Sequence, residues 1–325
     1  MIDASQRQPE AIMMREEDEL LISACCRYQF LTIVDMAYLL GLPSSLNYVR
    51  RIATRLAGHT DQEPGHYLYR FPLTRRGAGS SVRVFVPGQA SRTLLHQKED
   101  ADRCVFNKPA AMERYSYSFV SHNLAVTRLC ICAGLFCAGD YYLVETRLSY
   151  DMTPSPPRVS LTMGGKTASV PVIPDCWLFI ERVADSQGTA LWWEVDNATT
   201  YREAFHRRLA ARLKLITSEA YFEYFGTDAA ILCYAVLGNE TRVHTLAHWT
   251  WELLVRQKYE HLASRFLFTA IGYETLYGQI QTLFRQPVWR LPADRDQEDC
   301  PYVALFPPPQ DKEQTHGNSQ TTDRW

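Results

Sequence analysis

The feature that most restricts the fold of this chain is a pair of apolar, strand-like segments with acidic residues at one end. Asp175 comes directly before the first run, 176–181. Glu194 and Asp196 follow the second run, 190–193. An Asp-Ser-Gln-Gly turn signal lies between the two runs. This pattern predicts an antiparallel β-hairpin.

In such a hairpin the start of one strand lies beside the end of the next. Asp175 is therefore expected close to Glu194 and Asp196, with opposed Cβ atoms roughly 5 Å apart. Buried like charges at that distance repel unless a cation or a basic side chain compensates them. A divalent-metal nuclease site is built this way, with Asp175 and Glu194 as the metal ligands. The alternative is that these carboxylates simply point into water, and the spacing alone does not separate the two.

Composition sets the outer limits. At 325 residues, of which 46% are hydrophobic, the chain is long enough for two domains. Its 34 basic and 36 acidic residues nearly cancel, so only the local distribution of charge can indicate a partner. The sequence has no long uninterrupted apolar run and no signal-peptide layout at its start, which predicts a soluble cytoplasmic protein without membrane contact. The nine cysteines lack zinc-site spacing and are expected in the core.

Residues 16–96 are expected to form a DNA-binding domain. Hydrophobic periodicity and capping signals predict three helices and then two strands, at 17–28, 32–41, 46–57, 66–71 and 82–86. Three helices followed by a basic hairpin is the layout of a winged helix-turn-helix, whose third helix enters the major groove of DNA.

The charge of this region supports the same interpretation. Between residues 44 and 92 there are eight arginines and two acidic residues, an excess of six positive charges in a chain whose net charge is −2. An exposed helix face must be polar in any case, but a face this rich in arginine and free of acids favours DNA contact. The predicted DNA-binding residues are Asn47, Arg50, Arg51, Thr54 and Arg55 on the third helix, and Arg75 and Arg76 in the hairpin loop.

A polar linker at 97–114 is predicted to lead into a second domain at 115–306, and residues 1–15 and 307–325 are predicted to be disordered. Strands alternate with helices in the second domain, which predicts an α/β sheet covered on both faces. Thr200 and Glu203 form a capping-box pattern for a helix that extends to about Tyr224.

Two arginines on that helix, Arg208 and Arg212, fall at the edge of its apolar stripe and are expected to point toward the sheet. They have two possible roles. One is a structural ion pair with Glu194 or Asp196. The other is to hold a scissile phosphate beside metal-bound carboxylates. The structural pair is slightly favoured, because an active metal site leaves its carboxylates free.

The chain resembles the replication-relaxation family of bacterial plasmid and mobile-element proteins. Short matches occur in order from residue 17 to residue 271. They are Asp18-Glu19-Leu20-Leu21, residues 27–32, Leu39-Leu40-Gly41, residues 49–56, residues 121–126, Ile173-Pro174-Asp175, residues 193–199 and residues 231–237.

The resemblance implies a winged helix joined to a PD-(D/E)xK nuclease-like domain, that is, a restriction-endonuclease-like fold with a mixed sheet. In that fold Asp175 and Glu194 match the two motif acids. Asp196 stands where the motif has its lysine, and a lysine that the family often places on the next helix is Arg208 here. An arginine stays protonated and cannot serve as a general base, which argues against hydrolysis.

The sequence therefore predicts a DNA-binding accessory protein of plasmid or mobile-element replication or relaxation. Its second domain would be catalytically degenerate, its partner double-stranded DNA, and further partners replication or mobilisation proteins or a second copy of the chain. One alternative is a Mg²⁺-dependent endonuclease or nickase that uses Asp175 and Glu194, assisted by Asp196 and Arg208. Another is a winged-helix transcriptional repressor.

Overall fold

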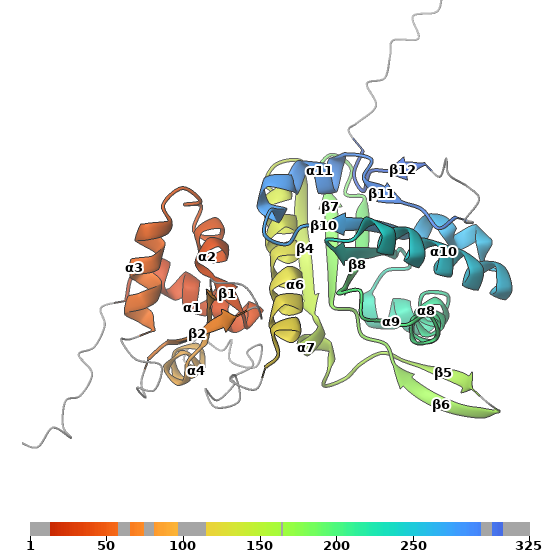
Figure 1. Cartoon of the computed structure of the whole chain (residues 1–325), viewed down its shortest axis with the longest axis horizontal. Helices are drawn as coiled ribbons and strands as arrows, with labels where there is room; N and C mark the ends of the chain where they lie inside the picture. Colours follow the sequence, from red (N-terminus) through yellow and green to blue (C-terminus); the bar gives the residue numbers. More distant parts are fainter. Residues whose placement is uncertain are drawn as a thin grey trace, which may run out of the picture.

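A computed structural model describes residues 14–57, 66–74, 81–96, 115–163, 165–293 and 301–307. The chain is a mixed α/β protein. The described residues between 14 and 96 form what we call the N-terminal unit, and the described residues between 115 and 307 form the C-terminal unit (Figure 1). The predicted linker, nearly all of the predicted disordered ends, and Arg75 and Arg76 lie outside the described residues.

The N-terminal unit packs helices against a small antiparallel sheet with the strand order β1-β3-β2. Its described elements are α1 (Glu16–Tyr28), β1 (Leu31–Thr32), α2 (Ile33–Leu39), α3 (Leu46–Leu56), β2 (Leu68–Thr74), β3 (Ser81–Pro87) and α4 (Gln89–His96). The capping box predicted at Thr32 and Asp35 is confirmed, because each side chain bonds the other residue's backbone N–H at the start of α2. The helix α3 buries the apolar stripe Val49, Ile52, Ala53 and Leu56, which leaves its opposite face outside.

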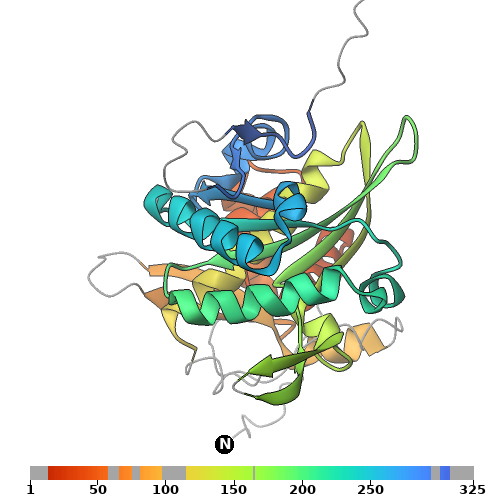
Figure 2. The same ribbon diagram turned by 90° about the vertical axis from the view of Figure 1, so that its right-hand side faces the viewer.

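The C-terminal unit is built on a seven-stranded sheet with the order β12-β11-β10-β9-β8-β7-β4. Strands β8, β9 and β10 run parallel to one another, whereas the flanking pairs are antiparallel. The strands of this sheet are β4 (Tyr141–Leu148), β7 (Cys176–Arg182), β8 (Gly188–Asp196), β9 (Ile231–Leu237), β10 (Phe266–Ile271), β11 (Trp289–Arg290) and β12 (Tyr302–Val303). A separate hairpin, β5 (Arg158–Met163) with β6 (Lys166–Pro171), projects away from the body (Figures 1 and 2).

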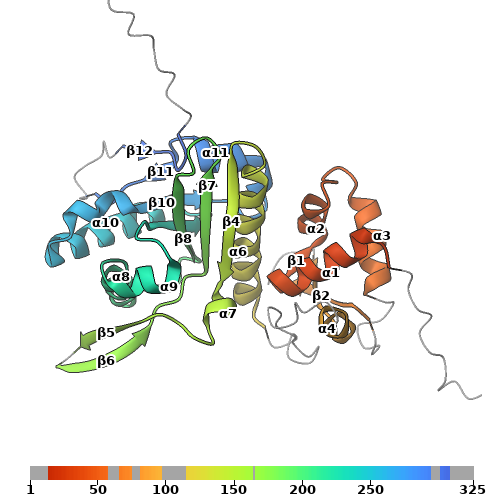
Figure 3. The ribbon, with the colours of Figure 1, turned by 180° about the vertical axis from the view of Figure 1, so that it is seen from behind.

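Helices cover both faces of this sheet, as predicted. The helices α6 (Tyr117–Phe136) and α11 (Ile280–Arg285) lie on the side that faces the N-terminal unit (Figures 1 and 3). The helices α8 (Arg202–Ile216), α9 (Glu219–Phe225) and α10 (Glu240–Gln257) lie on the other side (Figure 2). The short elements are α7 (Ser149–Met152), η3 (Glu260–Arg265) and η4 (Leu276–Gln279). Successive side chains of β8 point to opposite faces of the sheet. Trp193 lies in the core on the α6 side, and Trp192 lies in the core on the α8 side.

The helix predicted from Thr200 to Tyr224 differs in two respects. The residue that precedes its first turn is Tyr201, without a capping side chain, so the Thr200–Glu203 capping box is wrong. The helix is also interrupted, because the hydroxyls of Thr217 and Ser218 bond back to the carbonyls of Leu213 and Leu215, and the chain restarts as α9. Serine and threonine compete in this way with the helical backbone bonds.

Buried polar contacts join the two units. Asp35 of α2 is fully buried and accepts hydrogen bonds from Arg128 Nε at 2.7 Å and from the Tyr277 hydroxyl at 2.8 Å. The ring of Tyr38 stacks on that of Tyr277 with centroids 3.9 Å apart. Arg27 of α1 pairs with Asp151 of α7 at 2.8 Å. Because the apolar core also continues from α1–α3 into α6, the units are held in one relative orientation.

The helix α6 is long and apolar enough to span a membrane by length and composition alone. In the fold, however, 72% of its most apolar window is buried against the rest of the protein. A core helix with this composition is consistent with a soluble protein.

Candidate functional site

The predicted acidic hairpin is present. Strands β7 and β8 pair antiparallel with Cys176 opposite Trp193, so the residues just beyond this pair, Asp175 and Glu194, meet at one end of the two strands. The three carboxylates therefore lie at one rim of the sheet, but each of them has separate protein partners.

Asp175 is held from the α6 side of the sheet. Its Oδ2 accepts the backbone N–H of Val195 at 2.8 Å, and its Oδ1 lies 3.2 Å from Nε2 of His122 near the start of α6. No local sequence signal indicates this contact, because His122 and Asp175 are more than fifty residues apart. We call the three carboxylates, together with His122 and the arginines that contact them, the rim cluster.

Glu194 is held from the α8 side. It is 8% exposed, with Oε2 2.5 Å from the guanidinium of Arg212 and Oε1 accepting the indole N–H of Trp192 at 2.7 Å. Arg212 is itself buried and reaches the Tyr234 hydroxyl. The structural pair expected between this helix and the acidic strand end is confirmed for Arg212 and Glu194.

Asp196 is paired with Arg242, a partner that the sequence did not suggest. Its Oδ2 is 2.8 Å from Nε of Arg242, in the first turn of α10, and also accepts the backbone N–H of Ala198 at 3.0 Å. The same guanidinium donates to the carbonyl of Thr200 and lies over the ring of Trp249 at 4.9 Å. Asp196 thus fixes the loop after β8 against α10.

These donor sets do not fit a magnesium ion. Mg²⁺ needs carboxylate oxygens that are free to enter an octahedral shell. Both oxygens of Glu194 are taken by Arg212 and Trp192, and those of Asp175 face Val195 and His122. Within the ranges that the structure covers, no group of three or more His, Cys, Asp or Glu side chains is arranged to hold a metal.

Arg208 is placed differently from the expectation that it points toward the sheet. It is exposed and donates to the Thr200 hydroxyl at 2.5 Å. Together with Glu194, Asp196 and Arg212 it borders a cavity of about 140 Å³. Helical periodicity predicts both Arg208 and Arg212 at the edge of the apolar stripe of this helix. Only Arg212 is buried, because Arg208 lies one helical turn nearer the exposed rim of the sheet.

The pKa values of Glu194 and His122 in the cluster are displaced. Burial raises the pKa of Glu194 to about 7, with a further rise from the charge of Asp175, although Arg212 and the Trp192 N–H favour its ionised form. Burial alone would lower the pKa of His122, but the hydrogen bond and charge of Asp175 outweigh it and raise this pKa above the ordinary value. Protonation of His122 therefore stabilises the fold below about pH 6.5, and this contribution is lost as the pH rises through the raised pKa.

The variant Asp175→Asn should lower the pKa of His122, since it removes the charge of Asp175 and leaves only the charges of Glu194 and Asp196 to oppose the effect of burial. NMR titration of the His122 ring, compared between wild type and variant, measures this shift. Glu260→Gln, a change far from the cluster, is the matched control and should leave the titration unchanged. An unaltered His122 titration in Asp175→Asn would contradict the pairing.

The second candidate site is the outer face of α3. Asn47, Arg50 and Arg51 are exposed, and Thr54 is half-buried. Arg50 donates to the Asn47 amide oxygen at 2.8 Å, and the Arg51 guanidinium lies 5.9 Å from the ring centroid of Tyr48. This face presents two guanidinium groups to the outside.

Arg55 has a different position from the other predicted DNA-binding residues. Its guanidinium is 2.5 Å from Oδ1 of Asp18, which is completely buried at the start of α1. Since a buried carboxylate needs its cation, Arg55 ties α3 to α1 and is not available as a simple phosphate contact. Arg83 of β3 is not among the predicted DNA-binding residues and is counted only in the excess of positive charge. It is exposed and lies beside the outer face of α3.

Comparisons with protein-family models, with curated proteins and with solved structures find no match to this chain. The arrangement of side chains is therefore what carries the functional argument.

Proposed function

We propose that the protein binds double-stranded DNA through the N-terminal unit and acts as an accessory factor in the replication or relaxation of a plasmid or mobile element. In this proposal α2 and α3 form a helix-turn-helix, and the β2–β3 hairpin is its wing. The C-terminal unit has a nuclease-like fold without catalysis. It contributes a platform for replication or mobilisation proteins, or for a second copy of the chain, in the cytoplasm.

The observation that carries the DNA-binding part is the exposed basic face of α3. The apolar stripe of α3 packs against two other helices, and its outer face exposes Arg50 and Arg51. Recognition helices that enter the major groove of DNA have this arrangement. Arg83, on the neighbouring strand, extends the positive surface. Guanidinium groups are suited to both phosphate and guanine contacts.

The proposed accessory, non-catalytic role of the C-terminal unit is supported by the contacts that its three carboxylates make. Glu194 and Asp196 are each neutralised by a buried or nearly buried arginine, and Asp175 is bonded to His122 and a backbone N–H. A hydrolytic site would require these oxygens for metal ions. Supercoiled plasmid incubated with the protein and Mg²⁺ or Mn²⁺ should therefore remain intact, and nicking that disappears in Asp175→Ala would contradict this part.

Arg51→Ala should weaken duplex binding by about 1 kcal/mol or more and reduce the slope of log K against log salt by about 1, if this residue contacts a phosphate. Fluorescence anisotropy at several salt concentrations measures both quantities. The wild-type slope is expected near −4, from four to five phosphate contacts. A slope near zero would remove the DNA-binding assignment.

Two further variants make this test specific. Arg256→Ala removes an exposed arginine at the end of α10 and should leave duplex binding unchanged. Arg55→Ala should instead lower stability, because it leaves Asp18 buried without its cation. Equal effects of Arg51→Ala and Arg256→Ala on binding would mean that the α3 face is not the contact surface.

A further inference from the structure

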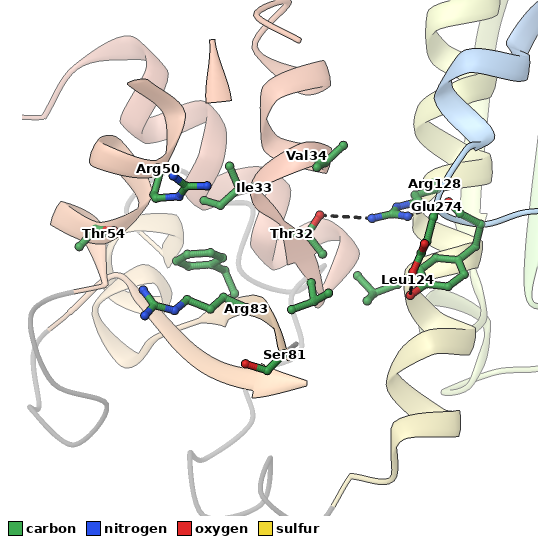
Figure 4. Close-up of a pocket in the computed structure, with 13 residues that line it drawn as sticks. Thr32, Ile33, Val34, Arg50, Thr54, Ser81, Arg83, Leu124, Arg128 and Glu274 are labelled. Carbon is green, nitrogen blue, oxygen red and sulfur yellow. Dashed lines mark hydrogen bonds between the residues drawn. The ribbon is translucent and has the colours of Figure 1, made fainter. Parts of the chain in front are cut away.

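A cleft of about 530 Å³ lies between the two units (Figure 4). Its N-terminal wall includes Arg50 and Thr54 of α3 with Ser81 and Arg83 of β3, and its other wall includes Leu124 of α6. The Asp35–Arg128 pair holds the walls at a fixed separation. The cleft is therefore formed before any ligand arrives, as is usual for binding sites.

The two walls differ in charge. Arg50 and Arg83 come from separate elements, are both exposed, and stand beside two hydroxyl groups, those of Thr54 and Ser81. In the part of the chain that the structure describes, neither guanidinium contacts a carboxylate. Such a set of donors is suited to phosphate oxygens.

The opposite wall offers a carboxylate acceptor and the ring of Tyr273, one side of which carries the buried guanidinium of Arg128 at 5.0 Å. Tyr273 is half-buried there, and its hydroxyl donates to Glu274 at 3.2 Å. Leu124 provides apolar surface next to it. Aromatic and apolar side chains bind the faces of nucleic-acid bases, and a carboxylate accepts hydrogen bonds from base amino groups. Glu274 would also repel a phosphate, which fixes the direction in which a nucleotide enters.

The volume of the cleft favours a single DNA strand over a duplex. The volume is within the range of about 300–1,000 Å³ that accommodates small molecules. A duplex, whose major groove alone is about 12 Å wide, needs more room than a cleft of about 530 Å³ provides. One or two unpaired nucleotides are of the right scale.

We propose that this cleft binds an unpaired DNA strand, with its phosphates on Arg50 and Arg83 and its bases toward Tyr273, Leu124 and Glu274. The inference goes beyond duplex binding and shares with it the edge residues Arg50, Thr54 and Arg83. A strand that leaves the duplex near α3 would continue into the cleft. The protein would then hold melted or nicked DNA open, which suits a factor that acts when plasmid DNA is unwound.

The test uses the full-length protein and a fluorescent six-nucleotide single strand, with a duplex measured in parallel. Ser81→Trp fills the cleft without changing its charge, and Arg83→Glu reverses one phosphate contact. Each should weaken single-strand binding at least about tenfold. Glu274→Trp, which narrows the cleft from the wall outside the helix-turn-helix and its wing, should do the same and leave duplex binding within about twofold. All three sites are exposed, so circular dichroism is expected to show unchanged folding. Arg256→Glu, outside the cleft, is the matched control.

The outcomes are distinct. Single-strand binding that is unaffected by Ser81→Trp and Arg83→Glu would overturn the proposal while leaving the duplex proposal intact. If the wild-type protein does not bind duplex DNA, the proposed function is overturned instead. A free mononucleotide that binds as tightly as the six-nucleotide strand would show a small-molecule site and would also overturn the inference.

Discussion

Replacing Arg128 with Met should lower the free energy of unfolding by about 3–5 kcal/mol, because it leaves a buried carboxylate without its cation. Asp35 is fully buried, and Arg128 Nε is 2.7 Å from its Oδ1. The hydroxyls of Tyr277 and Thr32 still donate to this carboxylate, but neither carries a positive charge. Urea denaturation followed by circular dichroism measures the loss.

Two variants test the explanation. Arg256→Met removes an exposed arginine of α10 and should change stability by less than about 0.5 kcal/mol. The double variant Arg128→Met/Asp35→Asn should recover part of the loss, because the amide removes the stranded charge. If Arg128→Met costs less than about 1 kcal/mol, the contact between the units does not depend on this ion pair.

The second large effect is expected for Arg212→Met in the rim cluster. Arg212 is the cation of Glu194, which is 8% exposed, and its removal should cost about 3–5 kcal/mol near neutral pH. Without Arg212, which opposes the effect of burial, the pKa of Glu194 should rise above its value of about 7 in the intact pair. Its carboxyl then takes up a proton instead of remaining as an unpaired charge.

The pH dependence follows from the sign of that shift. A carboxyl whose pKa is raised on folding stabilises the protein below its unfolded value, about 4.5, and this contribution is lost as the pH rises through about 7. Arg212→Met should extend the loss to higher pH, so thermal denaturation should show a small defect near pH 5 and a large one near pH 8. Arg212→Met/Glu194→Gln should remove most of the pH dependence. An equal defect at both pH values would contradict the buried pair.

Local signals in the sequence located many of these elements. The acidic hairpin followed from two apolar runs and a turn, and the Thr32–Asp35 box followed from capping residues at the correct spacing. The inward position of Arg212 followed from helical periodicity. Each of these depends on residues that are neighbours in the chain or in one hairpin.

Long-range partners could not be predicted in the same way. Arg128 is the single arginine of the apolar helix α6, and its partner Asp35 lies in the other unit, out of reach of any local sequence pattern. Arg242 and His122 meet the acidic rim only because α10 and α6 pack on opposite faces of the sheet. Arg55 follows the same polar face as Arg51, and only the packing of α1 against α3 commits it to Asp18.

Asp35 has two duties, since it both begins α2 and anchors Arg128 of the neighbouring unit. The N-terminal unit is therefore a poor candidate for transfer to another protein. A chimaera that carried residues 14–96 onto a foreign partner would bring a buried anion without the arginine and tyrosine that neutralise it. Recombination between relatives should thus succeed only where both sides of this contact are inherited together.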